Sequence, residues 1–528
     1  MRKLNYILFI SLFAIIAIKT NAQTTYVPDD SFEQALIDLG YDSGELDDYV
    51  LTAHIDTITV LDVSSKNISN LSGIEDFAAL TQLYCDNNEL MSIDVSKNSA
   101  LIKLDCSSNR LSSLNLSSNT LLQEFYCSGN DLTSLDISSN VELTKLYCDN
   151  NDLTSIDVTN NFKLTILYCT SNNLSSLDLS ANPGLTGLYC FNNYFLSDLD
   201  LSSNTALKEL YCGSNNMTDL DVSANTELTV LKCANNELTN LDISSNINLA
   251  KLYITHNEIA TIDVSNNSLL TEFYCDYNQL TNLNVSSKSD LVQLNCAHNL
   301  LTNIDASSCP ALDWLECEQN QLSSINISGD TSLYTFGCYD NQLASLDLSD
   351  NKSLRRLYCS KNQLTSLDLS GNKELYLLYC NYNQLKSLDM RNGNNERISY
   401  FGSTDNPDLT CIYVDDKTAS YLSDWTIDET TKFANDEADC NGTTSVNEIN
   451  TNENFRVYPN PTNGIIKFDF SGNIIQKIKI SDITGKTVFE KVSVEQNEVI
   501  DLSDFANGIY IVVLQTDKGS SSSKIIKE

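Results

Sequence analysis

Residues suited to catalysis are sparse in this sequence. The three histidines are His54, His256 and His298, and the last two are 42 residues apart, twice the 21-residue period described below. Two periods place them ~10 Å apart by strand spacing, which is too far for one zinc ion. Serines and aspartates recur as regular columns without a paired base, and no nucleophile motif or glycine-rich phosphate loop interrupts them. We therefore expect neither catalytic residues nor a metal centre, and we expect the protein not to be an enzyme.

Cysteine is the most regular of the chemically reactive residues. Of 17 cysteines, 14 recur at one position of the repeat, where Ile254 once substitutes: positions 85, 106, 127, 148, 169, 190, 212, 233, 275, 296, 317, 338, 359 and 380. The substitution indicates packing, because free cysteine behaves as a small apolar residue. Neighbouring coils also keep Cβ atoms nearer 4.8 Å than the ~3.8 Å of a disulfide. We expect mostly buried thiols, although the groups of eight and six around Ile254 leave pairing open.

Tyrosine forms a second column, at the outward-facing position directly before the cysteine column. It occupies positions 84, 126, 147, 168, 189, 211, 253, 274, 358 and 379. Flat apolar rings with hydroxyl rims suit sugars, peptides or protein loops. The alternative is structural, because stacked rings stabilise neighbouring strands whatever they bind. The candidate ligand-binding residues of this column are Tyr126, Tyr147, Tyr168, Tyr189 and Tyr211.

Departures from the repeat are more informative about a specific site, because folding alone requires only the repetition. One extra residue follows Cys190 and predicts a bulge that carries Phe191, Tyr194 and Phe195. Between residues 285 and 340 the tyrosines give way, and Trp314 stands beside Glu316. These five residues complete the candidate binding set, and drift in a tolerant repeat is the alternative.

Acidic residues give the chain a net charge of −38, which argues against nucleic acid or anionic membranes as partners. Many of them form a third column: positions 94, 136, 157, 178, 200, 221, 242, 263, 305, 347, 368 and 389. Carboxylates ~5 Å apart repel each other by about 1 kcal/mol in a water-like dielectric. Flanking serines, as in Ser134–Ser138, can relieve this through hydrogen bonds, and Ca²⁺ bridging is the second option. Hydrogen bonding is favoured, because no repeat supplies the dense ligand set of a dedicated calcium loop.

The element that positions these columns is the repeat LTSLDISSNVELTKLYCDNND, residues 132–152, of which fifteen copies keep register. Apolar residues alternate in Leu135–Ile137 and in Leu146–Cys148, so each run predicts a short strand with one outward side chain. Asn140 and Asn151 follow their strands by three residues, where an asparagine can bond the backbone of a tight bend. The sequence predicts an all-β-rich solenoid with two short parallel strands per coil and two asparagine ladders.

The consensus L-x-x-L-x-C-x-x-N followed by L-x-x-L-D-[LIV]-S-x-N resembles the nested 21-residue class of bacterial leucine-rich repeats. The resemblance covers residues 58–410 and implies the solenoid fold. It says nothing about the ligand.

The segments before the solenoid predict export and capping. Residues 1–22 have the basic start, apolar run and small-residue end of a signal peptide. Residues 23–57 lack the repeat and predict a cap with a short helix that Asp30 or Ser31 begins and Gly40 ends. A separate N-terminal binding module is the alternative.

The segments after the solenoid predict a second cap and a linker. Residues 411–440 form the expected cap, in which Cys411 and Cys440 could close a disulfide around Trp425; two unrelated thiols are the alternative. Residues 441–454 are polar and predict a linker. No later segment is long and apolar enough to span a membrane.

Residues 455–528 change character. Short alternating strands separated by Asn463-Gly464, Thr484-Gly485 and Asn507-Gly508 predict a small antiparallel β-sandwich. VYPNPTNG at 457–464, with the later turns and the lysine-bearing end, resembles the C-terminal type A sorting domain of the type IX secretion system. The resemblance implies passage across the outer membrane of a Bacteroidetes-type bacterium, followed by release or surface attachment. A carbohydrate-binding or adhesive β-domain is the alternative.

Together these observations predict a secreted or outer-membrane-surface protein that binds an extracellular protein or polysaccharide through its tyrosine-rich sheet. The sorting machinery would be a second partner. A passive surface rod and an accessory glycan-capturing protein are the alternatives. The sequence does not distinguish among their ligands.

Overall fold

The computed structural model describes residues 23–440, 456–469, 475–492, 499–516 and 519–528. It contains two compact units, residues 1–433 and residues 434–528. The predicted signal peptide at 1–22 and the linker at 441–454 lie outside the described residues.

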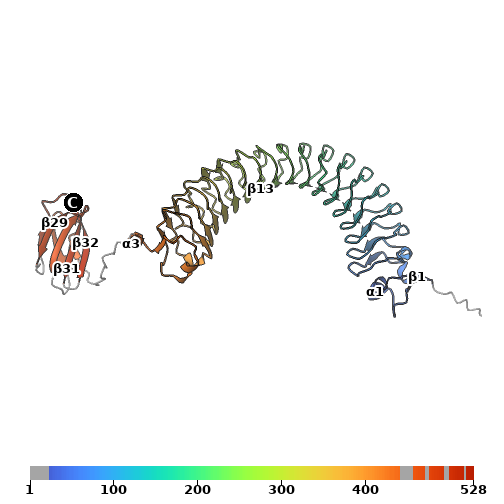
Figure 1. Ribbon diagram of the computed structural model, residues 1–528, viewed down its shortest axis with the longest axis horizontal. Coiled ribbons are helices and arrows are strands. Elements are labelled where there is room, and N and C mark those ends of the chain that lie inside the picture. The colour runs from blue at the N-terminus through green and yellow to red at the C-terminus, as the bar shows by residue number, and fades with distance from the viewer. Residues whose placement is uncertain (1–22, 441–455, 470–474, 493–498, 517–518) are drawn as a thin grey trace, which may run out of the picture. The chain divides into compact units, whose positions relative to one another are not determined.

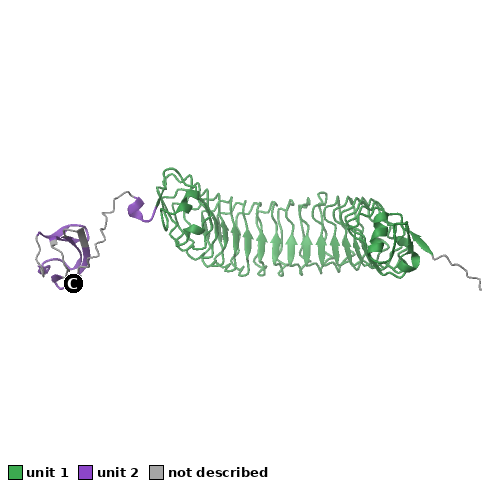
Figure 2. Ribbon diagram, turned by 90° about the horizontal axis from the view of Figure 1, so that it is seen from below, with its two compact units in different colours: residues 1–433 green, residues 434–528 purple. Residues whose placement is uncertain are grey.

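Unit 1 is a curved solenoid whose concave side carries one parallel sheet (Figures 1 and 2). Each coil contributes one three-residue strand, in register with the coils before and after it, as in Leu146↔Leu167. The middle residue is buried, and the outer two lie on the concave face. The strands are β3 (Val60–Asp62), β4 (Gln82–Tyr84), β5 (Lys103–Asp105), β6 (Glu124–Tyr126), β7 (Lys145–Tyr147), β8 (Ile166–Tyr168), β9 (Gly187–Tyr189), β10 (Glu209–Tyr211), β11 (Val230–Lys232), β12 (Lys251–Tyr253), β13 (Glu272–Tyr274), β14 (Gln293–Asn295), β16 (Trp314–Glu316), β18 (Thr335–Gly337), β19 (Arg356–Tyr358), β21 (Leu377–Tyr379) and β23 (Tyr400–Gly402).

The second strand expected in every coil is regular in only part of the solenoid, which corrects that detail of the prediction. Within the described residues it forms β15 (Asn303–Asp305), β17 (Ser324–Asn326), β20 (Ser366–Asp368) and β22 (Ser387–Asp389). Curvature explains the difference, because coils lie closest on the concave side and diverge away from it, beyond the spacing of ladder hydrogen bonds. In other coils the equivalent residues, such as Ser134–Asp136, form no regular strand.

Two asparagine ladders run through the solenoid. Asn151 Nδ2 donates to the Cys127 and Cys148 carbonyls at 3.0 and 3.2 Å, and its Oδ1 accepts from Leu132 N at 3.0 Å. In the second ladder, Asn140 Nδ2 donates to the Asn119 carbonyl at 2.8 Å. The ladders thus satisfy backbone groups that the bends would otherwise bury unpaired.

The cysteine column lies inside the solenoid beside the leucine core. All fourteen column thiols are free and buried, as is Cys309 of the second ladder, so the prediction of buried thiols is confirmed. Burial raises the pKa of these thiols, for example that of Cys190 to about 12. Protonated, buried thiols are poor nucleophiles, so the column contributes packing and no reactivity.

The N-terminal segment covers the first coil with β1 (Thr24–Tyr26), β2 (Tyr49–Leu51), α1 (Asp30–Asp38) and α2 (Thr52–Ile55). Helix α1 has Asp29 as its N-cap, one residue before the expected position, and Asp29 Oδ1 accepts from Phe32 N at 3.0 Å. Its other oxygen accepts from Ser69 Oγ at 2.7 Å, which fastens the helix to the first coil. A short 3₁₀ turn, η1 (Ile74–Asp76), follows.

The C-terminal end of unit 1 contains η2 (Asn395–Arg397), β24 (Cys411–Tyr413), η3 (Ser420–Asp424) and β25 (Lys432–Ala434). Trp425 is buried and stacks on Phe401 with ring centroids 4.1 Å apart. Cys411 and Cys440 are each disulfide-bonded. These residues close the apolar core at the last coil.

Unit 2 begins with α3 (Glu437–Cys440) and contains two antiparallel sheets, one of three strands and one of four in the described residues. The strands are β26 (Arg456–Tyr458), β27 (Ile465–Asp469), β28 (Ile475–Asp482), β29 (Thr487–Val492), β30 (Val499–Asp501), β31 (Gly508–Thr516) and β32 (Gly519–Lys527). Residues of both sheets share one apolar core, including Phe468, Ile480 and Val512. Lys527 is also buried, and its Nζ donates to the Ser503 carbonyl at 3.0 Å.

Candidate ligand-binding surface

The concave face of unit 1 carries a continuous run of stacked tyrosines, here called the tyrosine stack: Tyr126, Tyr147, Tyr168, Tyr189 and Tyr211. Successive ring centroids are 4.7, 4.4, 3.8 and 4.8 Å apart, and the first three pairs are nearly parallel. Each ring is half-buried, because it follows the buried middle residue of its strand. The structure thus brings these five predicted residues together in one half-buried stack.

The phenols of the stack are partly engaged within the protein. Tyr126 Oη donates to Glu124 Oε2 at 3.1 Å, and Tyr189 Oη donates to Glu209. Burial, together with these glutamates, raises the pKa of both phenols, so they remain neutral donors at physiological pH. Two of the five phenols of the stack are therefore engaged with glutamates of the protein.

Carboxylates around the stack have cationic partners. Glu124 pairs with Lys103 at 3.3 Å and with Lys145 at 2.8 Å. Farther along, Glu272 pairs with Lys251 at 2.7 Å. The Lys103 ammonium also lies 4.9 Å from the centroid of Tyr126. Glu124 and Glu272 are thus paired with lysines, whereas Glu209 accepts a hydrogen bond from Tyr189.

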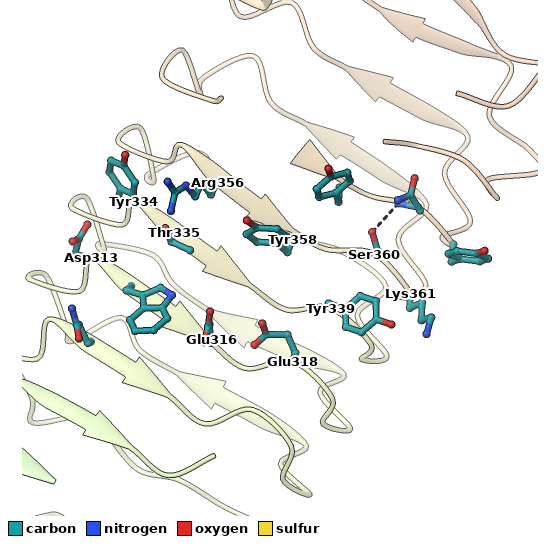
Figure 3. Close-up of a pocket in the computed structure, with 15 residues that line it drawn as sticks. Asp313, Glu316, Glu318, Tyr334, Thr335, Tyr339, Arg356, Tyr358, Ser360 and Lys361 are labelled. Carbon is teal, nitrogen blue, oxygen red and sulfur yellow. Dashed lines mark hydrogen bonds between the residues drawn. The ribbon is translucent and has the colours of Figure 1, made fainter. Parts of the chain in front are cut away.

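A hollow interrupts the face where the tyrosine column is replaced by Asn295, Glu316 and Gly337. It has a volume of about 810 Å³ (Figure 3). Its lining includes the rings of Trp314, Tyr339 and Tyr358, and Glu316 and Glu318 lie next to each other at one side of it. Tyr274 of a preceding coil meets Trp314 edge-to-face, with ring centroids 5.8 Å apart. Two of the predicted residues, Trp314 and Glu316, therefore line one site.

The two glutamates of the hollow are poorly compensated. Burial, joined by the negative charges of Glu316 and Asp276, raises the pKa of Glu318 to about 7 despite a bond from its own backbone N–H. Glu318 Oε2 is buried and accepts no hydrogen bond from the described residues. Burial also raises the pKa of Glu316, which a hydrogen bond from Trp314 partly offsets. A ligand that supplies donors or positive charge here would relieve this cost.

The third group of predicted residues lies elsewhere. Phe191 is half-buried and follows β9, and Tyr194 and Phe195 are 62% and 63% exposed in the turn beyond it. These aromatic side chains belong to coils far from β16 in the register of the sheet and do not line the hollow.

Sequence reasoning missed Glu318, Tyr339, Arg356 and Lys361 as residues of the site. A signal was present for two of them, because side chains two residues apart on an extended segment share a face. Glu318 stands two residues after Glu316, and Tyr339 stands two residues after Gly337. Arg356 and Lys361 occupy repeat positions that nothing in the sequence marks as unusual.

The aspartate column uses serine and threonine partners. Asp136 Oδ1 accepts from Ser138 N at 3.0 Å and from Ser138 Oγ at 2.7 Å, and Asp157 is bonded likewise by Thr159. These hydrogen bonds lower the pKa of both carboxyls. Across the described ranges, no group of three or more histidine, cysteine or acidic side chains is placed to hold a metal ion.

Comparison with known proteins defines the class of both units. Residues 456–528 match the family model of the secretion system C-terminal sorting domain. The chain is also similar to the functional domain of InlJ from Listeria monocytogenes, whose structure includes a cysteine ladder. That similarity has 25% identity and a TM-score of 0.60, and it covers 96% of this chain and 99% of that one. A leucine-rich-repeat protein of Leptospira interrogans matches with 22% identity and a TM-score of 0.57, over 71% of this chain and 97% of that one. A search of curated protein sequences gave no match.

Unit 1 is therefore a leucine-rich-repeat solenoid, and the C-terminal domain directs export by the type IX secretion system to the cell surface or beyond. Both resemblances seen in the sequence are confirmed. In the part of the chain that the structure describes, no helix combines the length and the apolar character needed to cross a bilayer.

Proposed function

We propose that this exported protein is a non-catalytic binding protein that holds an extracellular protein or polysaccharide on the concave face of its solenoid. One observation carries the proposal. The regular face departs from its repeat to form a hollow of about 810 Å³ with aromatic walls and a buried, unpartnered carboxylate oxygen. Buried oxygens without a partner in the described residues also recur in the regular second ladder, as at Asn140 Oδ1, but those are neutral amide oxygens. The hollow instead holds a carboxylate oxygen, whose burial without a donor costs more and is not required by the repeat.

The tyrosine stack supports the same proposal more weakly. Its half-buried rings extend the aromatic surface along neighbouring coils, as a long macromolecular ligand requires. Their close stacking, however, also favours the second candidate function, a structural surface rod in which the rings stabilise the sheet.

An array that combines extracellular proteins and polysaccharides tests the proposal, with the full chain as probe. The tyrosine variant is Y147A/Y168A/Y189A. Its matched control, D136A/D157A/D178A, alters the aspartate column of the same three coils. The proposal predicts a saturable ligand whose binding weakens in the tyrosine variant and persists in the aspartate variant.

The absence of any ligand would overturn the proposed function. If folded wild-type protein binds no protein and no polysaccharide, the proposal is wrong and the structural rod is favoured. A hit restricted to polysaccharides would identify an accessory glycan-capturing protein.

A further inference from the structure

The carboxylates of the concave face differ in how they are compensated. Glu124 and Glu272 form ion pairs with lysines of adjacent coils, at distances down to 2.7 Å. Glu316 and Glu318 form no ion pair within the described part of the chain. Some glutamates of the concave face thus have lysine partners, whereas the two in the hollow have none within the described residues.

The coil before Glu318 explains why its carboxylate oxygen has no hydrogen-bond donor among the described residues. The corresponding acids of other coils, Asp149 and Asp276, accept hydrogen bonds from the hydroxyl groups of Ser128 and Thr255, which precede them by one coil. The residue that precedes Glu318 by one coil is Ala297, whose side chain has no donor. The missing hydroxyl leaves Glu318 Oε2 buried without a partner.

Gly337 provides the space in front of this carboxylate. A Cβ atom at position 337 would lie 2.8 Å from Glu318 Oε1, so any side chain there would compete with the glutamate. With glycine at 337, the Glu318 carboxylate has room to lie there, and it lines the hollow together with the rings of Trp314, Tyr339 and Tyr358. Aromatic faces around an acidic centre are well suited to an ammonium or guanidinium group.

The cations that line the hollow are engaged with tyrosines. The Arg356 guanidinium lies 5.8 Å from the ring centroid of Tyr334, and the Lys361 ammonium lies 4.9 Å from that of Tyr339. With Asp313, the lining holds three carboxylates against two cations, in a chain whose net charge is −38. Charge complementarity therefore favours a cationic group over an anion or a neutral sugar.

We propose that the hollow binds a lysine or arginine side chain from a basic segment of an extracellular protein. This inference rests on the proposed function and narrows its ligand to a basic protein. The charged N–H groups of the ligand would donate to Glu316 and Glu318, while its alkyl stem and charge lie against the rings.

A hexa-arginine peptide titrated into the full chain tests the inference by calorimetry. The site variant is E316Q/E318Q, which keeps the shape of both side chains. The matched control, D136N/D157N, removes the same charge from the aspartate column. We expect the site variant to weaken binding by about tenfold or more, as charged hydrogen bonds are lost, and the control to change it less than about twofold.

The pH dependence of peptide affinity is an independent test, because Glu318 attracts a cation only when it is deprotonated. Wild-type affinity should rise between pH 6 and pH 8, as Glu318 titrates near its raised pKa, and this rise should be absent in E318Q. The ionisable groups around it are Glu316 and Asp276, the buried thiols of Cys296, Cys317 and Cys338, His298 in the preceding coil, and Tyr339, Arg356 and Lys361 of the same hollow. Among them, burial lowers the pKa of His298, which favours its neutral imidazole.

Three outcomes would overturn the inference. Equal weakening in the site and control variants would mean unspecific attraction to an acidic chain. Binding that neither variant nor pH alters would mean that the peptide binds elsewhere. If the array reveals only a polysaccharide whose binding the site variant preserves, the proposed function stands and this inference fails.

Discussion

The tyrosine stack and the hollow belong to one sheet and to one repeat, but they differ in what they leave unsatisfied. In the stack, rings contact each other at 3.8–4.8 Å, and Glu124 has two lysine partners. In the hollow, glycine replaces a tyrosine, alanine replaces a hydroxyl residue, and Glu318 is left unpartnered. A few substitutions thus convert a self-contained surface into one that favours a ligand.

Restoring the repeat in the hollow should have the largest effect. In G337Y, the new ring would stack beside Tyr358 and displace Glu318, because its Cβ lies 2.8 Å from that carboxylate. We expect hexa-arginine binding to fall by more than about thirtyfold, equivalent to about 2 kcal/mol, while the fold survives. Calorimetry measures this loss of affinity.

The matched control for this variant is G371Y, since Gly371 is exposed and a Cβ atom added there would meet no neighbouring atom within 4 Å. It should bind the peptide like the wild type. Comparable loss in both variants would show that added tyrosines disturb the solenoid in general.

Removing one asparagine of a ladder should have the second-largest effect, which is a loss of stability in the regular region. Asn172 is buried; its Nδ2 donates to the Cys148 carbonyl at 3.0 Å, and its Oδ1 accepts from Leu153 N at 3.0 Å. N172A should lower the free energy of unfolding by about 3 kcal/mol, because several buried backbone groups lose partners. Denaturant unfolding compares it with N173A, whose side chain is exposed and which should stay near the wild type.

Repairing a ladder in the irregular region should stabilise it. Asp330 occupies an asparagine-ladder position, both of its carboxylate oxygens are buried without a partner in the described residues, and burial raises its pKa to about 7. A folded-state pKa above the unfolded value means that wild-type stability falls as pH rises from about 4 to about 7. D330N lacks this decline and should be more stable than the wild type by about 2 kcal/mol at pH 8, with little difference at pH 4. Parallel pH profiles for the two proteins would refute this explanation.

Calcium should have the smallest effect. The column carboxylates already accept hydrogen bonds from serine or threonine two residues ahead, as Asp157 does from Thr159 Oγ1 at 2.6 Å. Thermal unfolding of the full chain should therefore shift by less than about 1 °C when calcium or a chelator is added. A marked rise in Tm with calcium would show that cations bridge the column.

Much of the fold could be predicted from the sequence, because each column is repeated in every coil. The 21-residue spacing located the buried cysteines, both asparagine ladders and the outward tyrosines. The second strand was overestimated, since alternation in Leu135–Ile137 reports which side chains are buried and not how far neighbouring coils diverge. Curvature is a property of the whole stack and is not written in one repeat.

The candidate site could be predicted only in part. Trp314 and Glu316 were recognisable because they replace the consensus, and the structure places both in the hollow. The role of Glu318 depends on two missing groups in neighbouring coils. Ala297, 21 residues before it, lacks a hydroxyl group, and Gly337, 19 residues after it, lacks a side chain. Such an absence becomes meaningful only when the coils are stacked in register.

Photo-crosslinking with a hexa-arginine peptide that carries a benzophenone tests most directly whether the hollow is the ligand site. After irradiation with the full chain, mass spectrometry locates the modified residues. A ligand site in the hollow predicts adducts concentrated in residues 313–361, and their loss in G337Y. Adducts spread along the aspartate column, or an unchanged pattern in G337Y, would contradict it.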